Sequence, residues 1–277
     1  MGMLTVRLRG GLGNQMFQYA IGRSLAEKYQ RKLFLVTDQL RGKGLPDRRE
    51  YSLHILKIRA ELTTVETITS MSGISVHVAE RGFDFHPEVF DCLPVFHIVL
   101  EGFWQSELYF KDIENIIRSE FLFASDDYDY ENPDLPTLIQ SSNSVCVHVR
   151  RGDYLTGNGS LDFIGLEYYA AAVQAVLSRI PNPHFFVFSD DIEWCKANMH
   201  WTQPHTFVTH QRSPEEKAEE DLRLMRLCKH FVIANSTFSW WAAWLGSAPE
   251  TVVIAPGRWF RSTPRPKGLF PETWLVV

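Results

Sequence analysis

The feature that most constrains this fold is a repeated alternation of short apolar strands with amphipathic helices. Residues 4–8 read as a strand that runs into a glycine-rich turn, and Asn14 opens a helix to about Tyr29. Apolar side chains recur along that helix at helical spacing, which predicts one packed face. Residues 33–36 read as the next strand. This β–α–β order predicts a parallel sheet.

The same alternation returns in the second half of the chain. A polar, turn-rich segment at 124–143 reads as a linker without a core of its own. The sequence Ser213-Pro214-Glu215-Glu216 has the form of a capping box that opens a helix. The remaining expected strands lie at 74–78, 96–100, 145–149, 185–188, around Phe207, 231–234 and 252–255, and the remaining helices at 166–179, from 192, 214–228 and 238–245. We therefore expect two doubly wound α/β lobes, residues 1–140 and 141–277, with a cleft between them.

Composition excludes several classes of protein. The 277 residues are 45% hydrophobic and 22% charged, as in ordinary globular proteins, and the net charge of −5 argues against a nucleic-acid binder. The four cysteines are widely spaced without a CxxC pair, which favours reduced thiols over a disulfide framework or a zinc site. The sequence shows neither a signal peptide nor an apolar run long enough to span a membrane, so we expect a cytoplasmic protein.

Two adjacent arginines at the end of a buried strand carry the strongest chemical signal. Arg150 and Arg151 follow the apolar run at 144–149. Desolvating a guanidinium costs several kcal/mol unless an anion pairs with it. Strand alternation places His148 and Arg150 on one face and Arg151 on the other. One arginine therefore faces a ligand, which we interpret as a diphosphate, while Asp153 pairs with the other. The alternative is an Arg–Asp pair that only holds a loop.

The glycine turn at 10–13 joins the first strand to the first helix. Glycines allow a ligand to approach the backbone, and a helix N-terminus attracts anions. Gly13, Asn14 and Gln15 are therefore candidates for binding an anion or a sugar, since a bare turn does not require the two amides. A dinucleotide fingerprint would need glycine where Met16 stands, so that interpretation fails at its third glycine. A purely structural turn stays open.

Acidic residues end another predicted strand. Ser189, Asp190 and Asp191 follow an apolar run, where carboxylates can accept hydrogen bonds from ribose hydroxyls or from guanine. One of the two can instead cap the following helix. A D-x-D pattern at Asp127 and Asp129 resembles a metal motif but lies in a polar loop, so we expect no metal site.

The densest polar segment begins where a predicted strand ends at Asn235. Ser236 and Thr237 stand at the start of the next helix, which makes this junction receptive to anions. The alternative is a simple helix cap. The three tryptophans of that helix fit helix packing better than a sugar-binding platform; they are Trp240, Trp241 and Trp244.

Four ordered motifs together resemble the bacterial α-1,2-fucosyltransferases. The run GGLGNQMFQYA at 10–20 resembles the opening of that family, and HVRRGD at 148–153 resembles its H-x-R-R-x-D motif. The latter motif is shared with α-1,6- and protein O-fucosyltransferases. GFWQSE at 102–107 and NSTFSWW at 235–241 are similar to the middle and C-terminal signatures. The likeness spans almost the full chain.

This resemblance implies a GT-B fold of two Rossmann-like lobes and a glycosyltransferase activity. The N-terminal lobe would take the acceptor, and the C-terminal lobe would bind GDP-β-L-fucose. Fucose would be transferred with inversion to the 2-hydroxyl of a terminal galactose, without a metal or another cofactor. An acceptor carried on a lipopolysaccharide precursor would bring the enzyme into peripheral contact with the inner membrane.

The resemblance also implies roles for single residues. Arg151 would bind the β-phosphate and stabilise the departing GDP, while Arg150 would be structural or a second phosphate contact. His148 and Asp221 would bind the guanine, and Asn14 would position fucose or diphosphate. The diphosphate would also contact two hydroxyls, those of Ser236 and Thr237.

The catalytic base is not evident from the sequence. Asp153, Glu101 and Glu107 are the candidates, and a loose transition state needs no strong base. Two rival functions stay open: a GDP-fucose transferase that makes an α-1,6 or protein linkage, and a nucleotide-sugar-binding protein without turnover. The acceptor and the oligomeric state are not encoded in a recognisable pattern.

Overall fold

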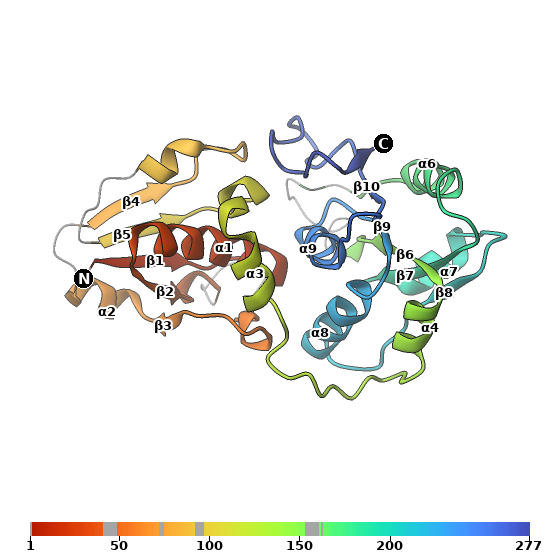
Figure 1. Cartoon of the computed structure of the whole chain (residues 1–277), viewed down its shortest axis with the longest axis horizontal. Coiled ribbons are helices and arrows are strands. Elements are labelled where there is room, and N and C mark those ends of the chain that lie inside the picture. Colours follow the sequence, from red (N-terminus) through yellow and green to blue (C-terminus); the bar gives the residue numbers. More distant parts are fainter. Residues whose placement is uncertain (1, 41–48, 72–74, 92–96, 153–160, 162) are drawn as a thin grey trace. The chain divides into compact units, whose positions relative to one another are not determined.

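The chain folds into two compact α/β units. The computed structural model describes residues 2–40, 49–71, 75–91, 97–152, 161 and 163–277 (Figure 1). The first unit comprises Met1–Asp126 with Pro266–Phe270, and the second comprises Asp127–Arg265 with Pro271–Val277. Residues 127–140, which the sequence analysis assigned to the N-terminal lobe, thus pack with the second unit.

The first unit is built on a parallel sheet of five strands in the order β3-β2-β1-β5-β4. The strands are β1 (Met3–Arg7), β2 (Lys32–Val36), β3 (Glu61–Thr63), β4 (Ser75–Ala79) and β5 (His97–Glu101). The helices are α1 (Leu12–Tyr29), α2 (Val65–Met71) and α3 (Glu114–Glu120). Short 3₁₀ turns lie at η1 (Asp38–Leu40), η2 (Leu53–Ile55), η3 (Pro87–Asp91), η4 (Glu107–Tyr109) and η5 (Lys111–Ile113). From β1 the chain builds β2 and β3 on one side of this strand. It then crosses to the other side and forms β4 at the edge and β5 beside β1, so the strand order reverses between β1 and β5.

Helix α1 packs closely on the first sheet because a glycine stands at the contact. A Cβ on Gly22 would lie 2.5 Å from Cγ2 of Val6 on β1 and 3.0 Å from Cδ1 of Leu33 on β2. Most of α1 is buried, including Met16, Phe17 and Ile21. The predicted helical spacing therefore corresponds to a helix that contacts protein on most of its circumference.

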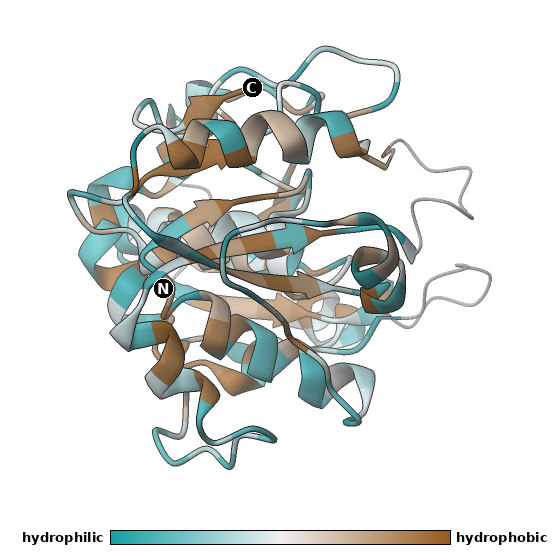
Figure 2. Cartoon of the chain, turned by 90° about the vertical axis from the view of Figure 1, so that its right-hand side faces the viewer, coloured by the Kyte–Doolittle hydropathy of each residue, from teal (hydrophilic) through white to brown (hydrophobic). Residues whose placement is uncertain are grey.

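The second unit is built on a parallel sheet of six strands in the order β11-β10-β9-β6-β7-β8. In Figure 2 these strands are largely brown, while the helices that cover them carry teal outer faces. The strands are β6 (Asn143–Val149), β7 (Pro183–Ser189), β8 (His205–Phe207), β9 (His230–Val232), β10 (Val253–Ala255) and β11 (Leu275–Val276). The helices are α4 (Leu135–Ser141), α6 (Leu166–Leu177), α7 (Ile192–Asn198), α8 (Pro214–Met225) and α9 (Thr237–Gly246).

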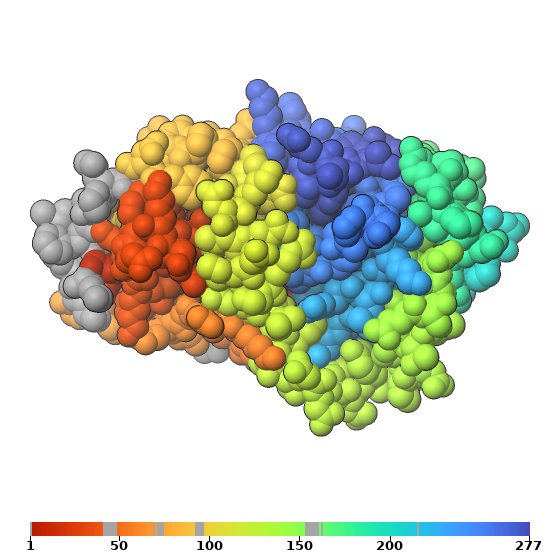
Figure 3. Space-filling model, in the orientation of Figure 1, coloured from red at the N-terminus to blue at the C-terminus, as the bar shows by residue number. Residues whose placement is uncertain are grey.

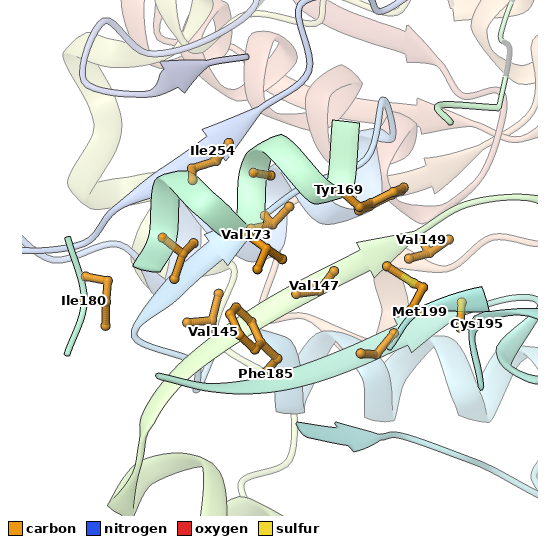
Figure 4. Close-up of a cluster of buried hydrophobic side chains, with 14 residues drawn as sticks. Val145, Val147, Val149, Tyr169, Val173, Ile180, Phe185, Cys195, Met199 and Ile254 are labelled. Atoms are coloured by element: carbon orange, nitrogen blue, oxygen red, sulfur yellow. The ribbon is translucent and has the colours of Figure 1, made fainter. Parts of the chain in front are cut away.

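Strand β6 separates the helices of the second unit into two layers. Val145, Val147 and Val149 point into a core formed with α6 and α7, which includes Tyr169 and Val173 (Figure 4). The alternate residues of β6 face the other side, where the ring of His148 lies 5.9 Å from the ring of Phe238 on α9. Because β6 leads to β7 and β8 in one direction while β9 pairs on its other side, the strand order reverses between β6 and β9.

The expected strands and helices are present, with boundaries shifted by a few residues. The capping box at Ser213 is formed with Glu216. The tryptophans of α9 are buried, which confirms helix packing for Trp240, Trp241 and Trp244. Strands β3 and β11 were not predicted.

The predicted linker at 124–143 is corrected in one respect. It contains α4, which packs against β6 and α8, and Leu135 and Ile139 of this helix are buried. The polar residues around this helix mask its apolar face in the sequence. This segment therefore contributes to the core of the second unit.

Three cysteines are buried free thiols, namely Cys146, Cys195 and Cys228, and Cys92 lies outside the described residues. Within the part of the chain that the structure describes, no helix combines the length and the apolar character needed to cross a membrane.

Candidate active site

The two arginines after β6 have different surroundings. The Nη1 atom of Arg150 lies 3.2 Å from Oδ2 of Asp190. Arg151 forms an ion pair between Nε and Oδ2 of Asp191 at 3.0 Å, and its guanidinium carbon lies 3.9 Å from the ring centre of Trp194. A second ring, that of Phe163, lies 4.8 Å from the same carbon. Arg151 is therefore held by a carboxylate and two aromatic rings, as cation–π packing favours.

Arg150 follows the last residue of β6 and lies close enough to His148 for its charge to lower the pKa of that imidazole. The Arg151 side chain is 13% exposed and that of Arg150 is 27% exposed. Arg151 contacts Trp194 on α7 and so supports the opposite face of the sheet. The sequence analysis gave the phosphate contact to Arg151, whereas this arrangement favours Arg150.

The acidic pair after β7 holds the arginine loop. Asp190 accepts hydrogen bonds from the backbone N–H groups of Arg151 and Gly152, at 2.9 and 3.0 Å. Asp191 caps α7 by accepting the N–H of Trp194 at 3.2 Å, as one alternative for this pair had expected. The predicted partner of the second arginine, Asp153, lies outside the described residues, and Asp191 takes this place for Arg151.

His148 is a buried, neutral imidazole. Burial is the main cause that lowers its pKa to about 3, and the positive charges of Arg150 and Lys217 act in the same direction. Among the described residues, its Nδ1 atom has no hydrogen-bond partner. A buried polar atom without a partner is costly, so this nitrogen is suited to a ligand.

The N-terminus of α9 lies beside the end of β6, because β9 pairs with β6 and leads into this helix. Ser236 occupies the cap position, but its side chain forms no capping hydrogen bond. Asn235 is buried and its amide donates to the carbonyl oxygen of Trp259 at 3.0 Å. The first turn of α9 therefore presents backbone N–H groups and two hydroxyls, from Ser236 and Thr237, at the point where the strand order reverses. Ligands of open α/β sheets bind at such reversal points.

Helix α8 contributes one acidic and one basic group. Asp221 is 8% exposed and its Oδ1 lies 2.7 Å from Nε2 of His210. Lys217, one turn earlier, donates from Nζ to the carbonyl oxygen of Ser189 at 2.8 Å. The Ser189 hydroxyl accepts the N–H of Asp191 at 3.0 Å, so it serves the turn after β7. Lys217 was not among the predicted site residues, although its four-residue spacing from Asp221 predicts one shared helix face.

The glycine turn of the first unit is fixed by amide side chains. The Gln15 amide donates to the carbonyl oxygens of Gly10 and Glu50, at 3.0 and 2.9 Å, and accepts the N–H of Ser52 at 2.9 Å. These bonds occupy the Gln15 amide, which favours a structural role over a ligand contact.

Asn14 lies at the reversal point between β1 and β5. Its Oδ1 accepts a hydrogen bond from the Gln105 amide at 3.1 Å. Gly10 has a φ of +77°, and a Cβ there would lie 2.5 Å from Nδ2 of Asn14. The glycine is therefore required by the close approach of this amide. Gly13 is buried in the first turn of α1, whose N-terminus has no side-chain cap.

Glu101 and Glu107, the two other candidates for the catalytic base, differ in their surroundings. Glu101 ends β5 and forms an ion pair with Arg7, which also pairs with Asp38 at the start of η1. Glu107 begins the turn η4. The ion pair with Arg7 occupies the Glu101 carboxylate, which makes it less available to an acceptor hydroxyl.

One cluster of possible metal ligands lies elsewhere in the second unit. Single ligand atoms of Glu131, His210 and Glu220 all lie within 4.8 Å of one another. Nε of Arg212 lies 2.9 Å from Oε2 of Glu220 and therefore already supplies positive charge to these acids. The expected loop acid Asp129 instead offers its backbone oxygen to Arg212.

Comparison of the sequence with known proteins identifies the family of this chain. Residues 1–275 match the model of "Glycosyl transferase family 11". An alpha-1,2-colitosyltransferase of Escherichia coli is 34% identical, covering 100% of this chain and 99% of that protein. The galactoside 2-alpha-L-fucosyltransferase SEC1 of Bos taurus is 28% identical over 100% of this chain and 74% of its own length.

Solved structures share the fold at low sequence identity. Fucosyltransferase NodZ from Bradyrhizobium has a TM-score of 0.51 and 12% identity, covering 87% of this chain and 93% of NodZ. A point mutant of Arabidopsis thaliana FUT1 in complex with GDP has a TM-score of 0.52 and 14% identity, covering 92% of this chain and 70% of that one. These likenesses confirm the predicted two-sheet, GT-B type of fold. The full-length family match and the 34% identical relative show that the chain belongs to glycosyl transferase family 11 and is a glycosyltransferase.

Proposed function

We propose that this enzyme transfers L-fucose from GDP-β-L-fucose to the 2-hydroxyl of a terminal galactose, with inversion and without a metal ion. Two relatives support the donor and the acceptor. The bovine protein is named a galactoside 2-alpha-L-fucosyltransferase, and a NodZ structure of the same fold was soaked with GDP-fucose. That NodZ structure has a TM-score of 0.50 and 14% identity, over 88% of this chain and 93% of NodZ.

The observation that carries the proposal is the position of Arg150 at the reversal point of the second sheet. The charge of its guanidinium acts on the neutral His148, and the neighbouring strand β9 leads into α9, whose N-cap residue Ser236 forms no side-chain capping hydrogen bond. A fixed cation and helix N–H groups at one strand end suit a diphosphate. Arg150 is thus the proposed β-phosphate ligand, with Ser236 and Thr237 as further contacts. Arg151 supports the loop, and its predicted phosphate contact gives way to this assignment.

The chemistry follows from this placement. The galactose O2 attacks C1 of fucose, and the bond from C1 to the β-phosphate oxygen breaks with its electron pair on that oxygen. Negative charge therefore grows on GDP in the transition state, where the guanidinium interacts more strongly than in the ground state. The hydroxyl proton leaves to solvent or to a base, and Asp153 stays a predicted base. In this scheme Arg150 supplies the positive charge that a divalent cation supplies elsewhere.

The guanine base of the donor nucleotide would be recognised by His148 and Asp221. A neutral imidazole with an unused Nδ1 can form one hydrogen bond to guanine, and a carboxylate can accept from its N–H groups. Equal affinity for GDP and UDP in calorimetry would contradict this assignment.

The proposal is tested by turnover with defined sugars. The purified protein would be incubated with GDP-fucose and with lactose, Galβ1-3GalNAc or Galβ1-3GlcNAc, and the product linkage would be located by NMR. We expect α-linked fucose on the galactose 2-position. Fucose on another position would favour an α-1,6 or protein transferase, and tight GDP-fucose binding without turnover would favour a binding protein.

A second donor sugar follows from one relative. The 34% identical protein is named an alpha-1,2-colitosyltransferase, so colitose is the competing sugar at the same linkage. Parallel assays with GDP-fucose and GDP-colitose distinguish the two, and a clear preference in kcat/KM for GDP-colitose would replace fucose as the donor.

A further inference from the structure

His210 lies at the centre of a buried charged cluster next to the proposed guanine site. Its side chain is 2% exposed, and Nε2 lies 2.7 Å from Oδ1 of Asp221. On its other edge, Nδ1 lies 3.8 Å from Oε2 of Glu131 and 3.9 Å from Oε1 of Glu220. Three carboxylates from two segments of the chain therefore surround one imidazole.

The acidic surroundings favour the doubly protonated form of the His210 imidazole. An ionised carboxylate only accepts hydrogen bonds, so a lone pair on Nδ1 would face the carboxylate oxygens of Glu131 and Glu220. Arg212 supplies one positive charge to this group at 2.9 Å from Oε2 of Glu220, which leaves three acids against one fixed cation. Although burial lowers the pKa of His210, the hydrogen bond to Asp221 and the charges of Asp221 and Glu220 outweigh it and raise this pKa, against a smaller opposing effect of Lys217.

The partners of His210 are themselves fixed. Glu131 accepts the backbone N–H of Gln211 with both oxygens, at 2.9 and 3.1 Å, and its own N–H donates to Oε1 of Glu220 at 3.0 Å. Arg212 and Arg223 both lie over the ring of Tyr128. Figure 3 shows the segment 127–141, in lime green, against the blue surface of α8. The imidazole is thus anchored on one side by this segment and on the other by α8.

We propose that His210 is a positioning residue that fixes the Asp221 carboxylate in the orientation that selects guanine over other bases. This inference rests on the proposed function, in which Asp221 binds the guanine N–H groups. The bond to Oδ1 restricts rotation of the carboxylate, and a carboxylate that is already oriented loses less entropy when the base binds. Without His210, Asp221 would be free to turn toward solvent or toward Lys217.

The test measures base selectivity rather than activity. Calorimetry would give the Kd of GDP and of IDP, which lacks the exocyclic amino group, for the wild type and for three variants. The variants are His210→Leu, which removes the hydrogen bond, His210→Gln, which keeps an N–H near the Nε2 position, and Asp221→Asn. The ratio of the two Kd values is insensitive to a partly unfolded preparation, because both ligands are measured on the same protein.

We expect the wild type to prefer GDP over IDP by roughly 10–100-fold, the usual contribution of a hydrogen bond to a charged group. His210→Leu should lower this preference by about tenfold, approaching the value of Asp221→Asn, while His210→Gln restores part of it. The matched control is His184→Leu, since His184 bonds to Thr206 and stacks on Phe186 near the opposite end of β7. This control should leave the ratio unchanged.

Two outcomes would overturn the proposal, and they are distinguishable. If Asp221→Asn lowers the GDP preference and His210→Leu does not, the positioning role is wrong and the guanine assignment holds. If Asp221→Asn itself leaves the preference unchanged, the guanine assignment fails, and the role of His210 fails with it.

Discussion

At the scale of single residues, strand alternation decides which arginine serves which face. The sequence predicted that Arg150 and Arg151 point in opposite directions, and in the structure they pair with different carboxylates, Asp190 and Asp191. It could not predict which arginine is anchored, because the anchors Asp191 and Trp194 arrive from a strand and helix about 40 residues later. The same holds for Gln15, whose hydrogen bonds to Gly10 and Glu50 have no local sequence pattern.

The two arginines should respond differently to removal. Arg150→Ala should lower kcat by ~10²–10³ with little change in melting temperature, the usual cost of one electrostatic donor in the transition state. Arg151→Ala should lower the melting temperature, because Asp191 and Trp194 lose their common partner. Steady-state kinetics and thermal melts of both variants provide the check. Near-normal turnover of Arg150→Ala would contradict the assignment.

His148 predicts an acid-sensitive fold. Its pKa of about 3 in the folded state lies below the unfolded value of ~6.5. Below pH ~6.5 the unfolded chain therefore binds a proton that the folded protein does not bind. Stability should therefore be unaffected above pH ~6.5 and should fall as the pH drops toward 3. Between pH 7 and pH 5 this residue alone should cost about 2 kcal/mol.

Urea unfolding of the wild type and of His148→Phe at both pH values measures this effect. The variant should lose less stability than the wild type on acidification. An equal loss in both proteins would show that the imidazole is not buried in its neutral form.

At the scale of helices and strands, apolar segments were predictable, including the short strands β9 and β10, whereas β3, β11 and α4 were not. Helix α1 and strands β6 and β7 carry enough apolar positions to define their period. Strand β3 has three residues, of which Glu61 and Leu62 are exposed, and β11 has two, so neither carries a period. Helix α4 was missed because only Leu135 and Ile139 face the core among polar neighbours.

The contact between α1 and its sheet can be tested at one glycine. Gly22→Ala should destabilise the protein by about 1–3 kcal/mol, since its Cβ would overlap Val6 and Leu33. The matched control is Gly11→Ala, because a Cβ on Gly11 has no atom within 4 Å. Chemical denaturation measures both, and equal effects would mean that α1 lies further from β1 than the structure has it.

The assignment of α4 to the second unit can be tested in the same way. Ile139→Ala should cost about 2–5 kcal/mol because it leaves a cavity against the sheet. Its neighbour Leu138 is 40% exposed, so Leu138→Ala should change stability by no more than about 0.5 kcal/mol. A similarly small effect of Ile139→Ala would support the original interpretation of this segment as a linker without a core.

At the scale of the whole molecule, each of the four sequence motifs lies at a strand end in its own sheet. The runs at 10–20 and 102–107 follow β1 and β5, the run at 148–153 begins in the last residues of β6, and the run at 235–241 follows β9. These are the two pairs of strands between which the order of each sheet reverses. The β–α alternation predicted parallel sheets, but the strand order that brings the motifs together in pairs depends on long-range pairing and was not predictable.

Metal removal tests the chemistry of the whole enzyme. Since Arg150 supplies the positive charge in the proposed reaction, EDTA should leave the turnover rate unchanged. The rate would be measured before and after chelation and again after Mg²⁺, Mn²⁺ or Zn²⁺ is added back. A loss that one of these ions restores would contradict the metal-free account and direct attention to Glu131, His210 and Glu220.

A crystal structure of this protein with GDP would test the proposed phosphate site. We expect β-phosphate oxygens within hydrogen-bond distance of the Arg150 guanidinium and of backbone N–H groups in the first turn of α9, with no metal ion bridging them. A diphosphate bound away from Arg150 and from α9, or one held through a divalent cation, would contradict it.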